Sequence, residues 1–246
     1  MIFVFKCTSG LGNRLCNLMN MFYLHSVYPQ ATYYVVWLIN PHCSAPLADL
    51  INLSEYRWIR YDYRTRPAEF YAQTSIQLRT RWDVIGEWTR HPIIVSVTHH
   101  MYAFVPLPFC IDLFTRLLYT PAVHAGIEDL KRRYGVDRKV IHFRSGDLLH
   151  LLEGDAASKR RVTEKVNRIE ESQNLLRFEY NQMVVNRSRS AVIESFSELL
   201  YLAKHCVVIA YCPYSWFSSW AYLLNRQYQV SKPVFDSRVV DLVMTA

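Results

Sequence analysis

The segment TYYVVWLI, residues 32–39, restricts the fold of this chain more than any other feature. It is rich in β-branched and aromatic residues, which favour strands, and the dipeptide Asn40-Pro41 ends it. A run as apolar as residues 35–39 is typical of a strand that is covered on both faces. Parallel sheets with helices on both faces contain such strands, so the segment predicts an α/β fold.

Strand-like and helix-like segments alternate along the rest of the chain. Residues 2–7 predict a strand, residues 10–13 a turn, and residues 14–27 a helix with one apolar face, which together with the strand at 32–39 make a βαβ unit. Residues 44–90 are dense in arginine and tyrosine and predict irregular structure with short helices. The same reasoning predicts further strands at 92–97, 139–143, 181–185, 206–211 and 239–244, and helices at 108–118, 122–134, 158–172, 195–204 and 216–225.

A break at Thr120-Pro121 separates two successive α/β halves. A chain of 246 residues has the length of one large domain or of two small ones. We therefore expect two Rossmann-like domains, residues 1–119 and 120–246, with parallel sheets facing a cleft.

Composition indicates a folded and basic protein. Hydrophobic residues make up 51% of the chain, which excludes a disordered chain, and the net charge of +7 suits a phosphate-bearing partner such as a nucleotide, a nucleic acid or an anionic membrane. The uncharged stretch 206–225 is interrupted by Pro213 and by serines, so it predicts a strand-turn-helix unit rather than a transmembrane segment. We see no signal peptide before the first strand and expect a cytoplasmic protein.

The segment VIHFRSGD, residues 140–147, begins as an apolar strand and ends in a cation, a glycine and a carboxylate. It places Arg144 at the carboxyl end of a strand, where parallel sheets bind ligands. The planar guanidinium matches phosphate oxygens in a bidentate way. Gly146 lets the backbone come close to a ligand, and Asp147 can hydrogen-bond the turn. The segment predicts a diphosphate site; the alternative is a surface Arg144–Asp147 pair that closes the turn.

Two other segments place polar groups at expected strand-to-helix turns. The segment SGLGNR, residues 9–14, carries two glycines and Asn13, but Leu15 stands where the dinucleotide-binding pattern has its third glycine, so the evidence for an NAD site is weak. Ser215, Ser218 and Ser219 lie where the helix at 216–225 should begin, and helix N-termini bind anions or are capped by such side chains.

The segments GLGNR, HFRSGD and SELLYLAKHCVVIAYCPYSWFS resemble, in this order, three landmarks of the superfamily of inverting fucosyltransferases. That superfamily includes α1,2-, α1,6- and protein O-fucosyltransferases and has a two-domain GT-B fold. The resemblance implies an enzyme that moves fucose from GDP-fucose to a glycan hydroxyl, with residues 1–119 on the acceptor side and residues 120–246 binding the nucleotide-sugar donor.

The resemblance also assigns roles to single residues. Arg144 would hold the β-phosphate of GDP-fucose, and Glu198 stands where the family often has an aspartate that reads guanine. The serine-rich family motif for phosphate and base falls on residues 215–218, where Trp216 interrupts it. The predicted catalytic residues are Arg144, Asn13 and Asp147, and the predicted donor-binding residues are Gly10, Gly12, Arg14, His142, Gly146, Glu198, Ser215, Phe217 and Ser218.

No metal or other cofactor is predicted. The sequence has no D-x-D motif, so we expect Arg144 to stabilise the departing diphosphate without a metal ion. The six cysteines form no C-x-x-C pair, which favours reduced thiols in the core over a disulfide or metal framework. The general base stays open among Asp147, Asp62 and Glu87.

Three alternatives remain beside this reading. Arginines between residues 57 and 90 are interleaved with tyrosine and tryptophan, as in proteins that bind single-stranded nucleic acid, but no nucleic-acid motif accompanies them and we do not expect such a partner. The chain could also be a transferase that uses another nucleotide sugar, or a nucleotide-sugar-binding module without activity. A donor screen and a turnover assay separate these.

Overall fold

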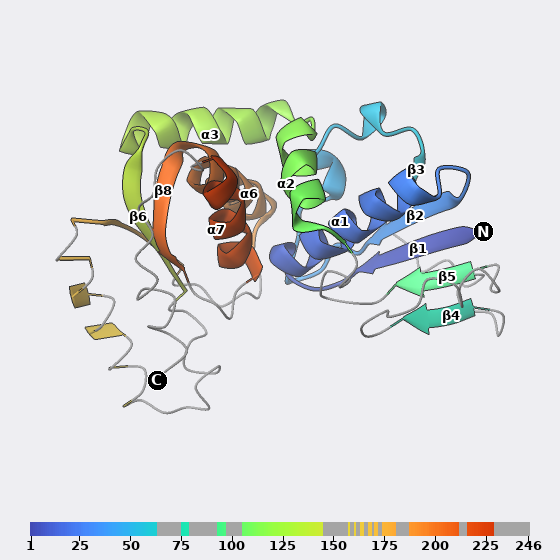
Figure 1. Ribbon diagram of the computed structural model, residues 1–246, viewed down its shortest axis with the longest axis horizontal. Helices are drawn as coiled ribbons and strands as arrows, with labels where there is room; N and C mark the ends of the chain where they lie inside the picture. Colours follow the sequence, from blue (N-terminus) through green and yellow to red (C-terminus); the bar gives the residue numbers. More distant parts are fainter. Residues whose placement is uncertain are drawn as a thin grey trace. The chain divides into compact units, whose positions relative to one another are not determined.

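The computed structural model (Figure 1) describes residues 1–62, 75–78, 93–96, 105–144, 157, 160, 163–164, 167–168, 170–171, 174–180, 187–211 and 216–228. The chain forms two compact units. Unit 1 comprises Met1–Ala122 and Arg187–Ile193, and unit 2 comprises Val123–Asn186 and Glu194–Ala246. Each unit contains a parallel β-sheet, so the α/β fold class predicted from the sequence is confirmed.

The described strands of unit 1 lie in the order β3-β2-β1-β5-β4, and all pair in parallel. They are β1 (Ile2–Cys7), β2 (Thr32–Trp37), β3 (Ile59–Asp62), β4 (Ser75–Leu78) and β5 (Ile93–Ser96). The central strand β1 pairs with β2 from Ile2↔Thr32 to Cys7↔Trp37. Because the two strands pair residue by residue without a shift, their carboxyl ends lie at the same edge of the sheet.

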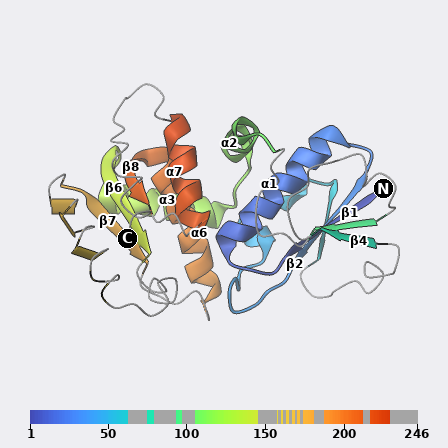
Figure 2. The ribbon, with the colours of Figure 1, turned by 60° about the horizontal axis from the view of Figure 1, so that its bottom comes forward.

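Apolar side chains cover both faces of this sheet. Val35, Val36 and Trp37 of β2 are each no more than 1% exposed. Successive residues of a strand point to opposite faces, so β2 is covered on both faces, as its apolar run predicts. The strand ends at Trp37, and Ile39 beyond it is 45% exposed. Helix α1 (Leu11–Val27) contacts β1 and runs along the sheet in Figure 2.

Shorter helices complete unit 1. Helix α2 (Leu107–Arg116) has a strongly one-sided apolar pattern and buries four side chains, those of Cys110, Ile111, Leu113 and Phe114. The 3-10 helices η1 (Leu47–Asp49) and η2 (Leu53–Glu55) follow β2 along the chain. Arg189 forms an ion pair with Asp49, with 2.6 Å between Nη2 and Oδ1. That pair ties residues 187–193 to η1 within unit 1.

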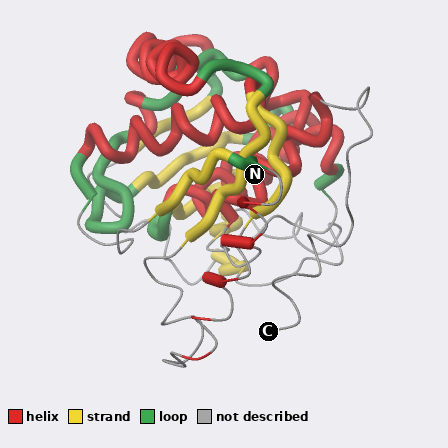
Figure 3. The backbone as a smooth tube through the Cα atoms, turned by 90° about the vertical axis from the view of Figure 1, so that its left-hand side faces the viewer, coloured by secondary structure: helices red, strands yellow, loops and turns green. Residues whose placement is uncertain are grey.

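The described strands of unit 2 are β6 (Arg138–Arg144), β7 (Leu176–Tyr180) and β8 (Cys206–Tyr211), in the order β7-β6-β8 and all parallel. From α3 onward, the described elements follow along the chain in the order α3 (Pro121–Tyr134), β6, β7, α6 (Arg189–His205), β8 and α7 (Trp216–Tyr228). Figure 3 draws the described helices in red and the described strands in yellow. Helix α7 contacts β8. Both α3 and α6 begin in a segment of unit 1 and continue into unit 2.

A close approach joins α3 to α6. The Ser197 hydroxyl of α6 donates to the carbonyl oxygen of Val123 in α3 at 3.2 Å. Gly126 leaves room for this contact, because a Cβ atom there would lie 2.4 Å from Ser197 Oγ and 2.7 Å from Ser197 Cβ. A side chain at position 126 would therefore force the two helices or the serine to move.

A buried asparagine joins α7 to the end of α6. Asn225 is 3% exposed, and its amide nitrogen donates to the carbonyl oxygens of Leu202 and Ala203 at 3.1 Å and of Cys206 at 2.5 Å. The last carbonyl groups of a helix have no partner within the helix. Asn225 supplies one, and so fixes α7 against the turn that leads into β8.

The start of α1 and two short strands differ from the sequence prediction. Helix α1 begins at Leu11 rather than at residue 14, because Gly10 adopts an extended N-cap conformation (φ −64°, ψ 163°) and Gly12 lies in the first turn. Strands β3 and β4 form where irregular structure is predicted. They are short outer strands, so pairing with the sheet, rather than a hydrophobic period of their own, makes them strands.

The region before α6 also differs. Strand β7 occupies Leu176–Tyr180, whereas the sequence predicts a strand at 181–185, and residues 181–185 lie outside the described part of the chain. The described residues within the predicted helix 158–172 are helical. The predicted strand at 239–244 also lies outside the described residues.

The described cysteines are reduced and buried, as predicted. Cys7, Cys16, Cys43, Cys110 and Cys206 are free thiols in the core. Burial raises the pKa of Cys7 to about 12 and that of Cys206 to about 11. Of the helices in the described part of the chain, none is long and apolar enough to cross a membrane.

Candidate functional site

Two of the three predicted site segments lie at the end of the central described strand of a sheet. In unit 1, residues 8–13 follow β1, whose neighbours are β2 and β5. In unit 2, Arg144 is the last residue of β6, whose neighbours are β7 and β8. After β1 the chain forms the neighbour β2 on one side and later the neighbour β5 on the other side. After β6 it likewise forms β7 on one side and later β8 on the other. Such a topological switch point is where open α/β sheets bind ligands, at the carboxyl ends of the strands.

The turn in unit 1 presents backbone donors. Gly10 is the N-cap of α1, no side chain caps the helix there, and the first turn has no acidic residue. The N–H groups of a first helical turn have no partner within the helix and carry partial positive charge. Gly12 is buried and Asn13 is half-buried in this turn. The arrangement suits an anionic or hydroxyl-bearing ligand.

Arg14 lies inside unit 1, with a side chain that is 0% exposed. Its Nε donates to the carbonyl oxygen of Ser9, and its Nη2 donates to the carbonyl oxygen of Leu38 at 2.9 Å and to Asn40 Oδ1 at 3.1 Å. The guanidinium carbon lies 4.9 Å from the centroid of the Trp37 ring. Burial lowers the pKa of Arg14. The guanidinium therefore binds the loops around it and has no exposed face.

In unit 2, three predicted donor-binding residues converge from three elements. His142 of β6 is 3% exposed, and its Nε2 lies 3.5 Å from Glu198 Oε1 of α6. The ring of Phe217, in the first turn of α7, lies 5.3 Å from the His142 ring, centroid to centroid. Glu198 is 30% exposed, so its carboxyl group is open to solvent while it faces His142. The site thus has a buried imidazole beside an accessible carboxyl group.

Arg144 is described only by its backbone, which pairs with Tyr180 of β7 at the end of β6. Its side chain lies outside the described part of the structure, as do Gly146, Asp147 and Ser215. Ser218 lies in the first turn of α7, without a described side chain. Of the other candidate bases, Asp62 ends β3 and Glu87 lies outside the described residues.

A β-bulge precedes His142. The pairing of β6 with β8 proceeds from Val140↔Val208 to Ile141↔Ala210 and so skips one residue of β8. Bulges increase the local twist of a strand and re-aim the residues that follow. The extra residue lies in β8, so the bulge increases the local twist of β8 beside the end of β6.

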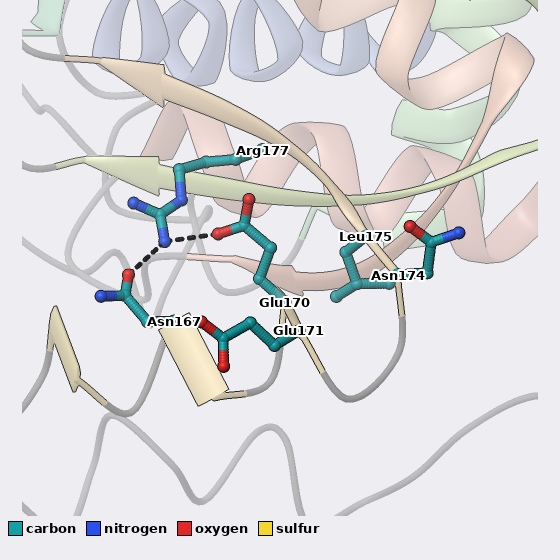
Figure 4. A pocket seen from close by; sticks show the side chains of 6 residues that line it. All are labelled: Asn167, Glu170, Glu171, Asn174, Leu175 and Arg177. Carbon is teal, nitrogen blue, oxygen red and sulfur yellow. Dashed lines mark hydrogen bonds and ion pairs between the residues drawn. The ribbon is translucent and has the colours of Figure 1, made fainter.

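The structure also shows a polar pocket of about 430 Å³ elsewhere in unit 2 (Figure 4). Arg177 contacts both Glu170 and Asn167 there. Arg177 lies at the start of β7, and Arg144 pairs with Tyr180 at its end, so the pocket is at the opposite edge of the sheet. Its lining residues, none of them a predicted site residue, are Asn167, Glu170, Glu171, Asn174, Leu175 and Arg177.

Within the described side chains, no group of three or more histidine, cysteine, aspartate or glutamate residues could hold a metal ion.

Asn40 is not among the predicted site residues, because in the sequence it marks only the end of a strand, although its side chain contacts Arg14. The available signal was its position, directly after the second strand of a βαβ unit.

Comparison with solved structures gives this fold a precedent. The fucosyltransferase NodZ from Bradyrhizobium superimposes with a TM-score of 0.53 at 14% sequence identity, over 90% of this chain and 93% of that one. A structure of NodZ α-1,6-fucosyltransferase soaked with GDP-fucose and one co-crystallised with GDP each give a TM-score of 0.51 at 13% identity, over 90% of this chain and 92% of theirs. The chain therefore has a fucosyltransferase-like fold.

Sequence comparison adds no closer relative. No protein-family model matches the chain, and no curated protein matches it.

Proposed function

We propose that this protein is an inverting, metal-independent fucosyltransferase that moves fucose from GDP-fucose to a glycan hydroxyl. One observation carries the proposal: two of the three landmark segments, GLGNR and HFRSGD, lie at the end of the central strand of a parallel sheet, at its switch point, in a fold shared with NodZ. The NodZ structures with GDP-fucose and GDP support a GDP-sugar as the donor class. In this proposal the two units act as the two domains of a GT-B fold.

Unit 2 binds the nucleotide in this proposal. Arg144 and the backbone near Gly146 contact the diphosphate, helped by Ser215 and Ser218 at the start of α7. The contact between His142 and Glu198 at 3.5 Å supports a role for Glu198 in binding the base, because it holds the carboxyl group at the strand edge while leaving it 30% exposed. Phe217 packs beside the same imidazole and provides an apolar surface there.

Unit 1 faces the sugar and the acceptor in this proposal. Gly10 and Gly12 let the backbone approach, and Asn13 offers an amide for sugar hydroxyls. Arg14, 0% exposed, acts by holding this turn rather than by touching the donor.

The proposed reaction is a single displacement. The acceptor hydroxyl oxygen attacks the anomeric carbon of fucose while the bond from that carbon to the β-phosphate oxygen breaks, so the configuration inverts. The electron pair leaves with GDP, where Arg144 stabilises the new charge, and the hydroxyl proton passes to a base, for which Asp147 is the candidate. A preorganised contact to developing charge typically lowers the barrier by about 3–4 kcal/mol.

Two assays test the proposal. Melting curves with GDP, UDP and CDP at equal concentration should show the largest stabilisation with GDP, because only ligands that bind the native state raise stability. Fucose transfer should persist in EDTA. Equal shifts with all three nucleotides would remove guanine recognition and favour a transferase for another nucleotide sugar; activity that disappears in EDTA and returns with Mn²⁺ would remove metal independence.

A further inference from the structure

Asn40 uses both the oxygen and the nitrogen of its side-chain amide in hydrogen bonds. Its Oδ1 accepts from Arg14 Nη2 at 3.1 Å and from the backbone N–H groups of His42 at 3.0 Å and Cys43 at 3.1 Å. Its Nδ2 donates to the carbonyl oxygen of Thr8 at 2.5 Å. One amide thus joins the loop after β2 to the loop after β1.

Arg14 makes the complementary set of contacts. It binds the carbonyl oxygen of Ser9 after β1 and that of Leu38 after β2. Asn40 and Arg14 therefore hold two consecutive carbonyl groups, those of Thr8 and Ser9, directly before the N-cap Gly10. Arg14 reaches the turn from inside the unit, since its side chain is 0% exposed, and Asn40 is half-buried.

These fixed carbonyl groups determine where α1 begins. Hydrogen bonds fix the carbonyl groups of Thr8 and Ser9 directly before the N-cap Gly10, and the helix starts at Leu11. The positions of Gly12 and Asn13 in the first turn therefore depend on these bonds. A lost bond to Thr8 would let the turn shift without unfolding the sheet, since β1 and β2 keep their own ladder from Ile2↔Thr32 to Cys7↔Trp37.

We propose that Asn40 is a positioning residue for transfer: acting with Arg14, it holds the turn of residues 8–13 so that Asn13 and the first helical amides meet the sugar in a reactive geometry. This inference rests on the proposed function. A displacement of about 1 Å at a reacting centre can lower the rate about 10²-fold, so the bonds of a residue that touches no substrate can control turnover.

The test compares Asn40→Ala, Asn40→Asp, Asn13→Ala and the double variant Asn13→Ala with Asn40→Ala. Asn52→Ala is the matched control, since Asn52 is an exposed loop asparagine of unit 1 whose side chain accepts from Ser54 at 2.7 Å. The measurements are kcat and KM for GDP-fucose, the rise in Tm with GDP, and backbone hydrogen exchange of residues 8–13.

We expect Asn40→Ala to lower kcat about 10- to 100-fold while the rise in Tm with GDP stays at the parent value, because GDP is bound by unit 2. Asn40→Asp keeps the oxygen that accepts from Arg14 and should recover part of the rate. The double variant should be no slower than Asn13→Ala, because both changes act on one geometry. A parent-like kcat in Asn40→Ala, or additive losses in the double variant, would overturn the positioning role.

Hydrogen exchange separates this inference from the proposed function. Asn40→Ala should exchange faster in residues 8–13 and at the parent rate in β2. If the parent neither binds GDP nor transfers fucose, the proposed function fails and exchange still tests whether Asn40 holds the turn. Unchanged exchange in residues 8–13 would overturn the inference, whatever the activity of the parent.

Discussion

The carboxyl end of β1 in unit 1 and that of β6 in unit 2 are built from different chemistry. After β1, a fully buried arginine and an asparagine amide bind backbone carbonyl groups. Near the end of β6, a buried imidazole faces a carboxyl group that is 30% exposed. The first arrangement fixes the path of the backbone, and the second places polar groups within reach of a ligand. We therefore expect substitutions at the turn after β1 to act on geometry and substitutions at the end of β6 to act on the ligand.

Two asparagines extend this comparison. Asn40 is half-buried and joins two loops at the ligand edge of the sheet in unit 1. Asn225 is 3% exposed and joins α7 to the end of α6 in unit 2. Asn225 lies deep in the core, so its loss should affect folding, whereas the loss of Asn40 should affect turnover.

The largest effect is expected at Arg144. Arg144→Ala should lower turnover about 10²- to 10³-fold, because the leaving diphosphate loses its cation, and Arg144→Lys should lose less because it keeps a charge without the bidentate fork. Steady-state kinetics with GDP-fucose measures both. Arg138→Ala is the matched control, since Arg138 is exposed at the other end of the same strand. Equal losses at both positions would show a general effect of charge rather than a site.

Asn225→Ala should give the largest loss of stability. Its amide serves three carbonyl groups that are left without this donor, and an unsatisfied buried polar group costs about 1–3 kcal/mol. Urea unfolding followed by circular dichroism measures the difference, with Asn52→Ala as the exposed control. A free energy of unfolding equal to that of the parent would mean that α7 does not depend on this contact.

Gly126→Ala should have a smaller effect. The new Cβ would lie 2.4 Å from Ser197 Oγ, and overpacking costs about 1–3 kcal/mol, but alanine favours a helix over glycine by about 1 kcal/mol. The net loss in the free energy of unfolding should be up to about 2 kcal/mol. Ser197→Gly removes the clashing atoms. In a Ser197→Gly background, Gly126→Ala should therefore leave the free energy of unfolding unchanged or raise it. If Gly126→Ala lowers the free energy of unfolding by the same amount in the Ser197→Gly background, the strain does not come from the contact with Ser197.

Glu198→Gln should have the smallest effect and should change ligand preference rather than folding. The carboxyl group is 30% exposed, and exposed pairs contribute at most about 1 kcal/mol to stability. We expect weaker GDP binding, by less than about tenfold, or about 1.4 kcal/mol, in isothermal titration. Glu194→Gln, one turn earlier on the same helix and exposed, is the control. Unaltered GDP affinity in Glu198→Gln would remove Glu198 from the proposed site.

Much of the fold follows from local patterns in the sequence. The apolar run of β2 predicts a strand covered on both faces, and the segment of β8 and α7 predicts a strand-turn-helix unit. Strands β3 and β4 were not predicted, because an outer strand of four residues is stabilised by pairing with its neighbour, which no local pattern records.

The candidate site was predicted less completely. The resemblance to fucosyltransferases predicts His142, Glu198 and Phe217 as donor-binding residues, and the structure brings these three side chains together. The burial of Arg14 and its bonds to Leu38 and Asn40 depend on two loops that are adjacent only because β1 and β2 are paired. The sequence therefore predicts a polar turn but not the contacts that hold it.

The central claim is that the carboxyl end of β6 binds the diphosphate of GDP. Melting curves of the parent and of Arg144→Ala, without nucleotide and with GDP at a hundredfold excess over Kd, test it most directly. The parent should gain about 2.7 kcal/mol of stability, and Arg144→Ala should keep the unliganded Tm of the parent while losing the gain. An Arg144→Ala protein with a lowered unliganded Tm and a full response to GDP would show instead that Arg144 is structural, and would contradict the account.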